Sequence, residues 1–287
     1  MPNGILIIDK PAGWTSMDIC AKIRGILREK RVGHGGTLDP MATGVLPVFV
    51  GRATRAVEFA ADSDKEYIAE LLLGVVTNTQ DASGEVLEEN EVSVTGEQLE
   101  AALDRFRGEI QQVPPMYSAI KINGKKLYEL ARKGKEVERK PRSVTIHELE
   151  LLGWPDAGES FRLRVRCSKG TYVRTLCHDV GQALGCGGCM SSLRRSMAAG
   201  FTLADAVTME DVQERGEALL RPLDSLFTQY PALTVRSAGQ EKRVRCGNPI
   251  TFPGAADGPY RIYGQQGEFL CLSQARNGAL TSVKNFF

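Results

Sequence analysis

The first part of the chain alternates between apolar runs and turn residues, a pattern that predicts strands and helices in mixed order. The apolar run Gly4–Lys10 is followed by a proline and a glycine, which predicts a buried strand that ends at a turn. Apolar residues at helical spacing predict a helix over residues 14–31, with Thr15 or Ser16 as its cap. The same reasoning predicts strands over residues 44–51 and 65–75 and a helix over residues 99–106.

Residues 161–167 alternate strictly between apolar and basic side chains. This period of two predicts a half-exposed strand with one buried face and a basic outer face. Residues 175–184 then return to helical spacing. The apolar positions of the strand are Phe161, Leu163, Val165 and Cys167, and the basic ones are Arg162, Arg164 and Arg166.

Residues 111–146 make a poor core segment, because prolines, glycines and nine basic residues interrupt every apolar run. We expect a long exposed excursion with one short helix over residues 127–133. Loops of this length within a compact domain are usually functional or disordered. After Tyr230 the pattern of residues changes to short apolar runs separated by glycine and proline turns. This pattern predicts a small all-β appendage of about 55 residues.

Composition changes this picture only through the distribution of charge. The chain has 287 residues and a formal net charge of +1, so its total charge points to no polyanionic partner. Residues 81–109, however, hold nine acids and two arginines, a balance of −7, and residues 121–142 have a balance of +6. Residues 160–176 contain five basic residues and no acid. Such separation suits a protein that presents one face to a polyanion, although solvated surfaces would show it too.

Several classes of protein are disfavoured. The N-terminus has no basic signal-peptide region, and no apolar run approaches the ~18 residues of a membrane span. The seven cysteines follow no secreted framework, so we expect a cytoplasmic protein with reduced thiols and no membrane association. The nearest candidate metal ligands are Cys177, His178, Cys186 and Cys189, but adjacent helical residues chelate poorly and we expect no metal.

The stretch GHGGTLDPMATG, residues 33–44, is the strongest candidate for chemistry. Its glycines do not have dinucleotide or Walker spacing, since Leu38 stands where a third glycine would be needed, so no nucleotide cofactor is expected. No histidine of the chain lies in a nucleophile-elbow context, and no second carboxylate pairs with Asp39 in a glycosidase pattern. Gly35 and Gly36 would let an RNA or ligand approach closely.

Asp39 itself allows two interpretations. Pro40 biases it to an extended conformation, so it suits a simple Asp-Pro turn. Alternatively, its carboxylate is a nucleophile, which in a buried pocket would need a cation, for which the bidentate geometry of arginine is well suited. The loop alone does not decide between them.

Six motifs occur in order along the chain: IDKPAGWTS, KRVGHGGTLDPMATGVLPVFVGRATR, KEYIAELLLGVVTNTQDASG, PPMYSAIKINGKKLYELARKG, KGTYVRTLCHDVG and SLRRSMAAGF. Together they resemble the TruB family of tRNA pseudouridine synthases, of the bacterial type that acts on uridine 55 in the T-loop. The resemblance covers about residues 4–226. The tail after Tyr230 resembles, by position and strand pattern, the small PUA-type RNA-binding domain of these enzymes.

This resemblance implies an α+β (mixed α/β) fold. A catalytic domain over residues 1–229 would contain a large, mainly antiparallel central sheet flanked by helices. Residues 111–146 would form its thumb-like RNA-binding insertion, and residues 230–287 would form the all-β PUA-like domain.

The resemblance also implies roles for individual residues. Asp39 matches the catalytic aspartate of the G-x-LDP-x-ATG motif, Arg174 the arginine that pairs with it, and Tyr67 the tyrosine that packs on the target base and is implicated in proton removal. The remaining matches line the substrate pocket. They are Tyr172, expected on the same strand face as Arg174; Leu193, an apolar wall; His34, which inserts where the flipped base left the stack; and Lys10, at the pocket floor.

These roles make physical sense. A stacked uridine must be extruded before its glycosidic bond can be reached, and an aromatic ring such as that of Tyr67 can stack on the flipped base. The reaction breaks a C–N bond and forms a C–C bond without redox change, so it needs no cofactor. The expected partner is tRNA, contacted at the T-loop and the acceptor and T-arms, by a monomer with no obligatory protein partner.

Three alternatives stay open from the sequence. The first is a guide-RNA-dependent rRNA pseudouridine synthase. The second is a non-catalytic RNA chaperone that opens the T-loop, an activity that can coexist with catalysis. The third is a cytosolic α/β hydrolase of unknown substrate.

Overall fold

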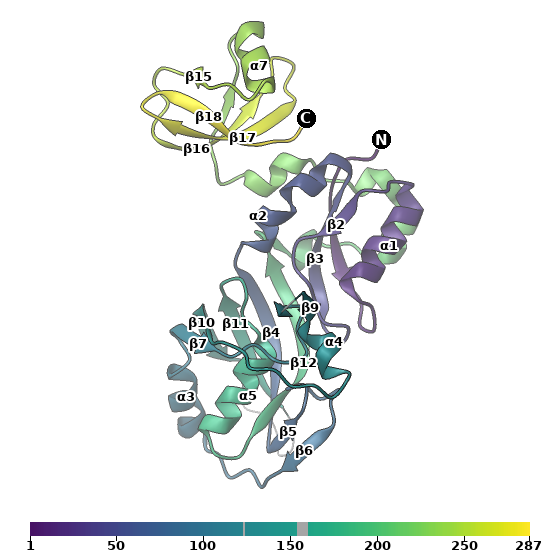
Figure 1. Cartoon of the computed structure of the whole chain (residues 1–287), viewed down its shortest axis with the longest axis vertical. Coiled ribbons are helices and arrows are strands. Elements are labelled where there is room, and N and C mark those ends of the chain that lie inside the picture. Colours follow the sequence, from purple (N-terminus) through teal and green to yellow (C-terminus); the bar gives the residue numbers. More distant parts are fainter. Residues whose placement is uncertain (123, 154–159) are drawn as a thin grey trace.

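The computed structural model describes residues 1–122, 124–153 and 160–287. In this part of the chain, nine strands form one large sheet that is the body of the molecule (Figure 1). The strands are β1 (Gly4–Lys10), β2 (Val32–His34), β3 (Thr43–Val50), β4 (Lys65–Leu73), β7 (Gly108–Gln112), β10 (Arg142–Leu151), β11 (Phe161–Cys167), β12 (Gly188–Ala198) and β13 (Phe201–Thr202).

The main path of the sheet runs β1-β3-β12-β4-β11-β10-β7, and β2 and β13 pair at its side with β3 and β12. The β12–β3 pair is parallel and the other recorded pairs of this sheet are antiparallel. The mixed α/β class with a mainly antiparallel sheet is therefore confirmed. This order brings β3, from the N-terminal part of the chain, against β12, which pairs on its other side with β4.

Helices cover this sheet. The first, α1 (Ser16–Leu27), begins with a capping box between Thr15 and Asp18 and buries an apolar stripe. It ends before the predicted residue 31, because Arg28 adopts a left-handed conformation with φ 52°. The other helices of the body are α2 (Val57–Ala61), α3 (Gly96–Asp104), α5 (Val173–Ala183) and α6 (Met209–Arg215), with short 3₁₀ turns η1 (Gly51–Ala56), η2 (Leu203–Asp205), η3 (Gly216–Leu219) and η4 (Leu223–Phe227).

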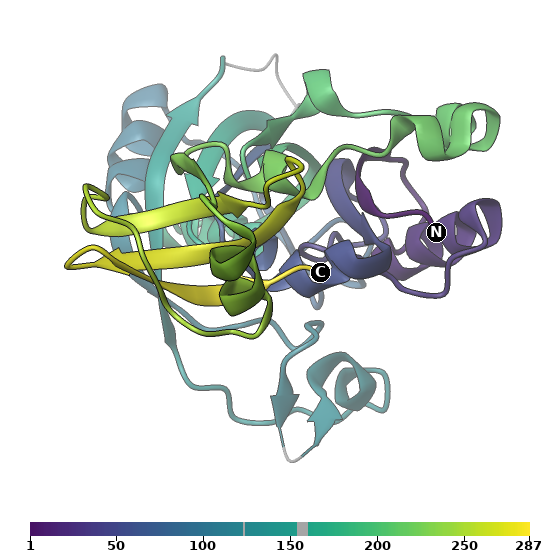
Figure 2. The same cartoon turned by 90° about the horizontal axis from the view of Figure 1, so that it is seen from above.

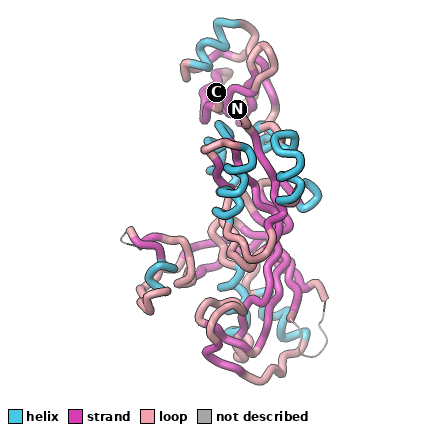
Figure 3. Tube along the Cα trace, turned by 90° about the vertical axis from the view of Figure 1, so that its right-hand side faces the viewer, coloured by secondary structure: helices cyan, strands magenta, loops and turns pink. Residues whose placement is uncertain are grey.

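The basic excursion is shorter than predicted, because its two ends belong to the main sheet. Gln112 at the end of β7 pairs with Arg142 at the start of β10. The segment between them holds β8 (Lys121–Ile122), β9 (Lys125–Lys126) and α4 (Leu127–Ala131), and it projects from the body (Figures 2 and 3). Residue 123, which the predicted excursion includes, lies outside the described residues. A second small hairpin, β5 (Val75–Thr77) and β6 (Val86–Glu89), lies at one end of the body (Figure 1).

The outer face of β11 is less positive than its sequence predicts. Arg164 lies 2.8 Å from Glu150, and Arg166 lies 3.0 Å from Glu148. Both glutamates come from β10, whose pairing with β11 sets each of them close to an arginine. Cross-strand pairs of opposite charge stabilise a sheet modestly. Two of the three arginines on this face are therefore already paired within the protein.

A separate five-stranded sheet forms the C-terminal tail (Figure 1). Its order is β14 (Ala232–Thr234), β16 (Gly258–Tyr263), β17 (Phe269–Arg276), β18 (Ala279–Asn285) and β15 (Ile250–Thr251). It encloses its own apolar cluster, including Ile262 and Leu270. The tail also contains a helix that the sequence pattern did not predict, α7 (Ala238–Arg245), which is mainly polar and buries only Val244.

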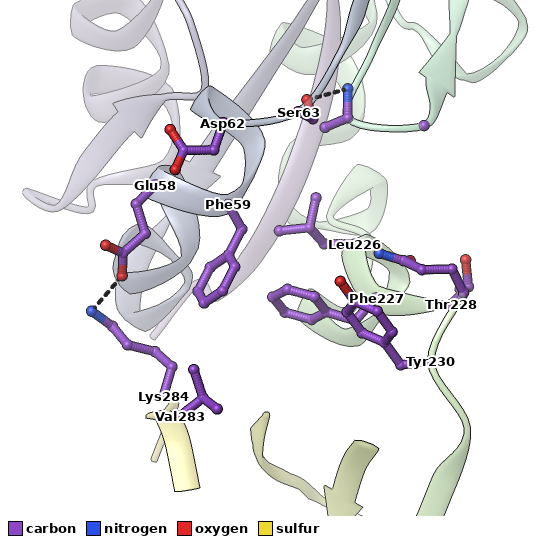
Figure 4. A pocket seen from close by; sticks show the side chains of 13 residues that line it. Glu58, Phe59, Asp62, Ser63, Leu226, Phe227, Thr228, Tyr230, Val283 and Lys284 are labelled. Carbon is purple, nitrogen blue, oxygen red and sulfur yellow. Dashed lines mark hydrogen bonds and ion pairs between the residues drawn. The ribbon is translucent and has the colours of Figure 1, made fainter. Parts of the chain in front are cut away.

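Aromatic and polar contacts join the tail to the body. The ring of Phe227 lies against Phe59 of α2 and against Phe286 from the tail. The Tyr263 hydroxyl donates to the Asp224 carboxylate at 2.6 Å. A cavity of about 870 Å³ opens beside this cluster, and Figure 4 shows Phe227 and the ion pair between Glu58 and Lys284 at its wall.

Candidate active site

The loop that carries Asp39 connects β2 to β3, and the start of α1 fixes it. The Leu38 N–H donates to the Ser16 hydroxyl at 2.9 Å. On the other side of Asp39, the Pro40 carbonyl accepts from the Gly13 N–H at 2.8 Å. Because both backbone bonds flank Asp39, the helix cap and the turn before it set the position of the carboxylate.

The glycines of this loop serve the packing of the protein itself. A Cβ on Gly35 would lie 2.5 Å from the Cβ of Ala60, so the hypothesis that Gly35 admits an RNA is wrong. Gly36 has φ +123°, a conformation that L side chains rarely adopt. Gly44 has φ +100°, and a Cβ there would lie 2.2 Å from the Arg195 carbonyl. The glycines therefore allow the tight path of the loop and the close pairing of β3 with β12.

Arg174 lies in the first turn of α5, where Tyr172 is the N-cap residue. The prediction that Tyr172 and Arg174 share a strand face is wrong. Strand β11 ends at Cys167, and Gly170, with φ +83°, turns the chain before the helix begins. Side chains two residues apart on a helix point in different directions. Tyr172 and Arg174 therefore reach the site from different sides.

The guanidinium of Arg174 joins four segments of the chain. Its Nε lies 2.9 Å from Oδ2 of Asp39, and its Nη1 lies 3.5 Å from Oδ2 of Asp81. Nη1 also donates to the Thr79 carbonyl at 3.1 Å. Nη2 donates to the Tyr117 carbonyl at 2.8 Å, which is a contact with the basic excursion. One buried cation thus holds two carboxylates and the root of the excursion.

Asp81 is a site residue that the sequence reasoning missed. Its side chain is 6% exposed, and its Oδ1 accepts from the Ser83 hydroxyl at 2.6 Å and from the Ser83 N–H at 3.0 Å. A buried carboxylate needs such partners. The signal was present in the quoted motif TNTQDASG, where an aspartate stands among hydroxyl and amide side chains.

Asp39 keeps an open side. Its side chain is 36% exposed, whereas that of Arg174 is 6% exposed. Burial raises the pKa of Asp39 above its ordinary value, the positive charge of Arg174 opposes this, and the negative charge of Asp81 adds to the rise. A carboxylate arranged in this way can meet a substrate atom while its counter-ion stays in place.

Tyr67 and Leu193 come from neighbouring strands of the sheet. Tyr67 on β4 is paired with Arg195 on β12, and Leu193, two residues earlier on β12, is paired with Ala69. Tyr67 and Leu193 are both buried. Burial raises the pKa of the Tyr67 hydroxyl, and the charge of Arg195 is the largest effect that opposes the rise. The register of the sheet therefore brings these two predicted residues close together.

Tyr172 is held from the root of the excursion. The Gln112 side chain donates to the Tyr172 carbonyl at 3.0 Å and accepts from the Tyr172 N–H at 2.9 Å. Burial raises the pKa of the Tyr172 hydroxyl, and hydrogen bonding with Ser118 opposes the rise. Gln112 is 1% exposed and is a second residue that sequence reasoning missed. It links the start of α5 to the last residue of β7.

Lys10 contacts the Asp39 loop, and His34 lies at the start of that loop. The Lys10 ammonium is fully buried and donates to the carbonyls of Trp14 at 2.7 Å and Pro40 at 3.3 Å. Burial lowers its pKa to about 8. His34 ends β2, and burial lowers its pKa as well. Lys10 thus acts on the backbone of the loop, and His34 is a neutral ring at its edge at neutral pH.

Comparison with known proteins decides the family. Residues 24–173 match the model of the TruB family pseudouridylate synthase N-terminal domain, and residues 174–228 match that of the tRNA pseudouridylate synthase B C-terminal domain. The chain belongs to the TruB family. The tRNA pseudouridine synthase B of Azoarcus sp. (strain BH72) is 45% identical over 97% of this chain and 93% of its own. That of Stutzerimonas stutzeri (strain A1501) is 46% identical over 95% and 91%.

Solved structures show the same fold. The chain is similar to a protein in a structure titled as a Cbf5-Nop10-Gar1 complex, with a TM-score of 0.74 and 26% identity over 99% of this chain and 85% of that one. A structure titled as an H/ACA RNP bound to a substrate RNA containing 2′-deoxyuridine gives a TM-score of 0.73 at 25% identity, with the same coverage. Family membership therefore rests on both sequence and fold.

The described residues include no group of three or more histidine, cysteine, aspartate or glutamate side chains placed to hold a metal ion. Burial raises the pKa of the Cys177 thiol to about 12, which disfavours the thiolate that binds metals. Cys186 and Cys189 are both buried free thiols. Within the described ranges, no helix is long and apolar enough to cross a membrane.

Proposed function

We propose that this protein isomerises uridine 55 in the T-loop of tRNA to pseudouridine. The observation that carries the proposal is the contact between Arg174 and the partly exposed Asp39, in a chain of the TruB family. The curated relatives at 45% and 46% identity are named tRNA pseudouridine synthase B. The proposal therefore joins a family assignment to a carboxylate that is open to substrate and has a buried counter-ion.

In the proposed reaction, Asp39 acts on the ribose of the target nucleotide while the glycosidic bond breaks. Arg174 keeps the carboxylate ionised and oriented, because its charge opposes the effect of burial on the pKa of Asp39. The detached base must stay in place before the new C–C bond forms. Tyr67, Leu193 and Tyr172 enclose it, with the Tyr67 ring as the stacking surface.

We assign extrusion of the base to His34, at the start of the Asp39 loop. Flipping a nucleotide out of its stack costs a few kcal/mol, which a side chain inserted in its place partly offsets. His34 suits this role, because its lowered pKa leaves the ring uncharged at neutral pH. Lys10 supports the loop through the Pro40 carbonyl without reaching the substrate.

RNA binding outside the active site is assigned to two surfaces, the excursion and the C-terminal tail. The excursion carries the +6 charge of residues 121–142 toward the phosphates of the T-arm. Residues 1–229 would form the catalytic unit, and residues 230–287 a PUA-like unit that contacts the acceptor arm. We infer that the protein works as a monomer in the cytoplasm without an obligatory protein partner and without a cofactor.

A guide-RNA-dependent activity has one observation in its favour, the similarity to chains in H/ACA structures. That similarity is 25–26% identity, against 45% for the bacterial tRNA enzymes. The two functions separate in one assay: purified protein with a tRNA transcript and no other component. Conversion of position 55 supports the tRNA function, and conversion only after a guide RNA is added supports the other. A chaperone function alone would leave uridine 55 unchanged.

A further inference from the structure

Arg195 is fully buried on β12, at 0% exposure, and is the largest fully buried side chain of the described residues. A charged side chain in the interior is rare unless it is paired. It follows Arg194 in the sequence, but Arg194 is 43% exposed and paired with Asp9 at 2.7 Å. The two adjacent arginines therefore have different environments: within the described residues, Arg194 has an ion-pair partner and Arg195 has none.

Two of the three guanidinium nitrogens of Arg195 are bound to backbone. Nε donates to the Val45 carbonyl at 2.7 Å, and Nη2 donates to the Gly36 carbonyl at 3.2 Å. Nη1 is buried and has no hydrogen-bond partner in the described part of the chain. A buried donor without a partner is costly, and more so when it is charged. The arrangement holds Arg195 against β3 and the Asp39 loop with one donor unused.

The neighbourhood of Arg195 is otherwise basic. Its charge lowers the pKa of Lys10, Lys65 and His34, although burial is the largest cause in each. A fixed cation beside two buried lysines stabilises any anion formed nearby. The group directly across the strand pair is Tyr67, whose Cα is the register partner of Arg195.

The groups that act on the Tyr67 hydroxyl come from three elements. Arg195 on β12 favours its ionised form by its positive charge. Cys167 on β11 and Asp39 on the loop disfavour that form, as does burial, which is the largest effect. Arg195 is therefore the positive group that acts on this hydroxyl.

We propose that Arg195 is a positioning residue that stabilises the Tyr67 phenolate as it takes a proton from the base, with the unused Nη1–H becoming the partner of the phenolate. The proposal rests on the proposed pseudouridine synthase function. Once C5 of the base is bonded to the ribose, the C5–H bond breaks and the proton passes to the Tyr67 oxygen. The electron pair restores the C5–C6 double bond and leaves negative charge on N1. N1 takes a proton from water and Tyr67 releases one, so no proton is gained or lost.

The test is Arg195→Lys, measured by single-turnover release of tritium from C5 of uridine across a range of pH. Lysine keeps the charge but cannot reach Val45, Gly36 and Tyr67 with one planar fork. Because Arg195→Lys stabilises the phenolate less, the pKa of Tyr67 should be higher in the variant than in the unchanged protein. We therefore expect a rate about tenfold lower near neutral pH, and the rate should recover as the pH rises and Tyr67 ionises. In a Tyr67→Phe background, Arg195→Lys should have no further effect.

Arg194→Lys is the matched control and should keep the pH profile of the unchanged protein. The proposal would be overturned if Arg195→Lys lowered the rate by the same factor at every pH. It would also be overturned if the double variant were slower than Tyr67→Phe alone by the factor that Arg195→Lys causes in the unchanged protein. Arg195→Gln replaces the variant if Arg195→Lys does not fold, with the same two readouts. If the unchanged protein releases no tritium, the proposed function fails first, and this inference fails with it.

Discussion

The Arg174 guanidinium meets the Asp39 carboxylate at 2.9 Å, although 135 positions separate the two residues in the sequence. Four segments converge on this contact: the loop after β2, the loop after β5, the root of the basic excursion and the first turn of α5. Because Arg174 also binds Asp81 and the Tyr117 carbonyl, a change in any of these segments should reach Asp39 through one guanidinium.

Asp81→Asn should slow the chemical step and move its dependence on pH. The negative charge of Asp81 contributes to the raised pKa of Asp39. Its removal lowers that pKa, so the loss of rate on the acid side should begin at a lower pH than in the unchanged protein. The measurement is the single-turnover rate of pseudouridine formation between pH 4.5 and 8.

Asp205→Asn is the matched control, because Asp205 pairs with Arg221 at 3.0 Å on a partly exposed surface. Exposed pairs of this kind contribute about 0–1 kcal/mol, and the rate should not change. An acid limb that stays in place, or moves to higher pH, in Asp81→Asn would contradict the role given to Asp81.

Lys10→Met should destabilise the protein and do so more strongly at alkaline pH. The substitution removes the hydrogen bond to the Trp14 carbonyl, which leaves that acceptor without this partner at a cost of about 1–3 kcal/mol, whereas the Pro40 carbonyl keeps the Gly13 N–H. The folded-state pKa of Lys10 is lowered from 10.5 to about 8, so between these values the unfolded chain binds more protons and stability rises with pH. The variant lacks this rise.

Urea unfolding at pH 7, 8, 9 and 10 measures this effect. The difference in unfolding free energy between the two proteins should grow from pH 8 to pH 10. Lys65 also has a pKa lowered to about 8, but it is present in both proteins and its effect cancels in the difference. A difference that shrinks as the pH rises would show that Lys10 is not desolvated.

Gln112→Ala should reduce turnover more than tRNA binding. The substitution removes both bonds to the Tyr172 backbone and leaves the Tyr172 N–H without this partner, at about 1–3 kcal/mol. Tyr172 is the N-cap residue of α5 and Arg174 lies in the first turn of that helix. The loss of these bonds should therefore loosen the orientation of the Arg174 side chain toward Asp39. Gln111→Ala is the control, since Gln111 is the neighbouring residue on the exposed side of β7. Equal turnover by the two variants would remove Gln112 from the site.

Excision of residues 114–140 should weaken tRNA binding and make it less dependent on salt. Gln112 and Arg142 are register partners, so a short glycine-serine turn can join the two strands. The excised segment holds eight basic and three acidic residues, whose phosphate contacts release counterions on binding. The affinity is measured at several salt concentrations, and an unchanged slope would exclude this segment as a phosphate-binding surface.

A second variant separates charge from geometry. Replacement of Lys121, Lys125 and Lys126 by glutamine keeps the contact of Arg174 with the Tyr117 carbonyl. We expect weaker binding with an unchanged single-turnover rate at saturating protein, whereas the excision should lower that rate as well. A lower saturating rate in the glutamine variant would assign these lysines to the chemical step.

Local pattern was sufficient for most elements, because β1 is a continuous apolar run that ends at a proline and β11 alternates strictly between apolar and basic residues. It was insufficient where long-range pairing decides. The arginines of β11 could not be recognised as paired before β10 was placed beside them. The roles of Asp81 and Gln112 depend on contacts across 93 and 60 positions, so the polar motif around Asp81 could not show which residue it meets. Tyr172 was wrongly predicted on a strand because the turn at Gly170 ends the extended segment, and α5 begins directly after Tyr172.

The central claim is that Asp39 isomerises a uridine of tRNA with Arg174 as its counter-ion and no added component. The most direct measurement is tritium release from an unmodified tRNA transcript that carries 5-tritiated uridine, with purified protein alone. The account predicts release equivalent to one uridine per tRNA, mapped to position 55, and none from Asp39→Asn even though that variant still binds the tRNA. Absence of release by the unchanged protein, or full turnover by Asp39→Asn, would contradict it.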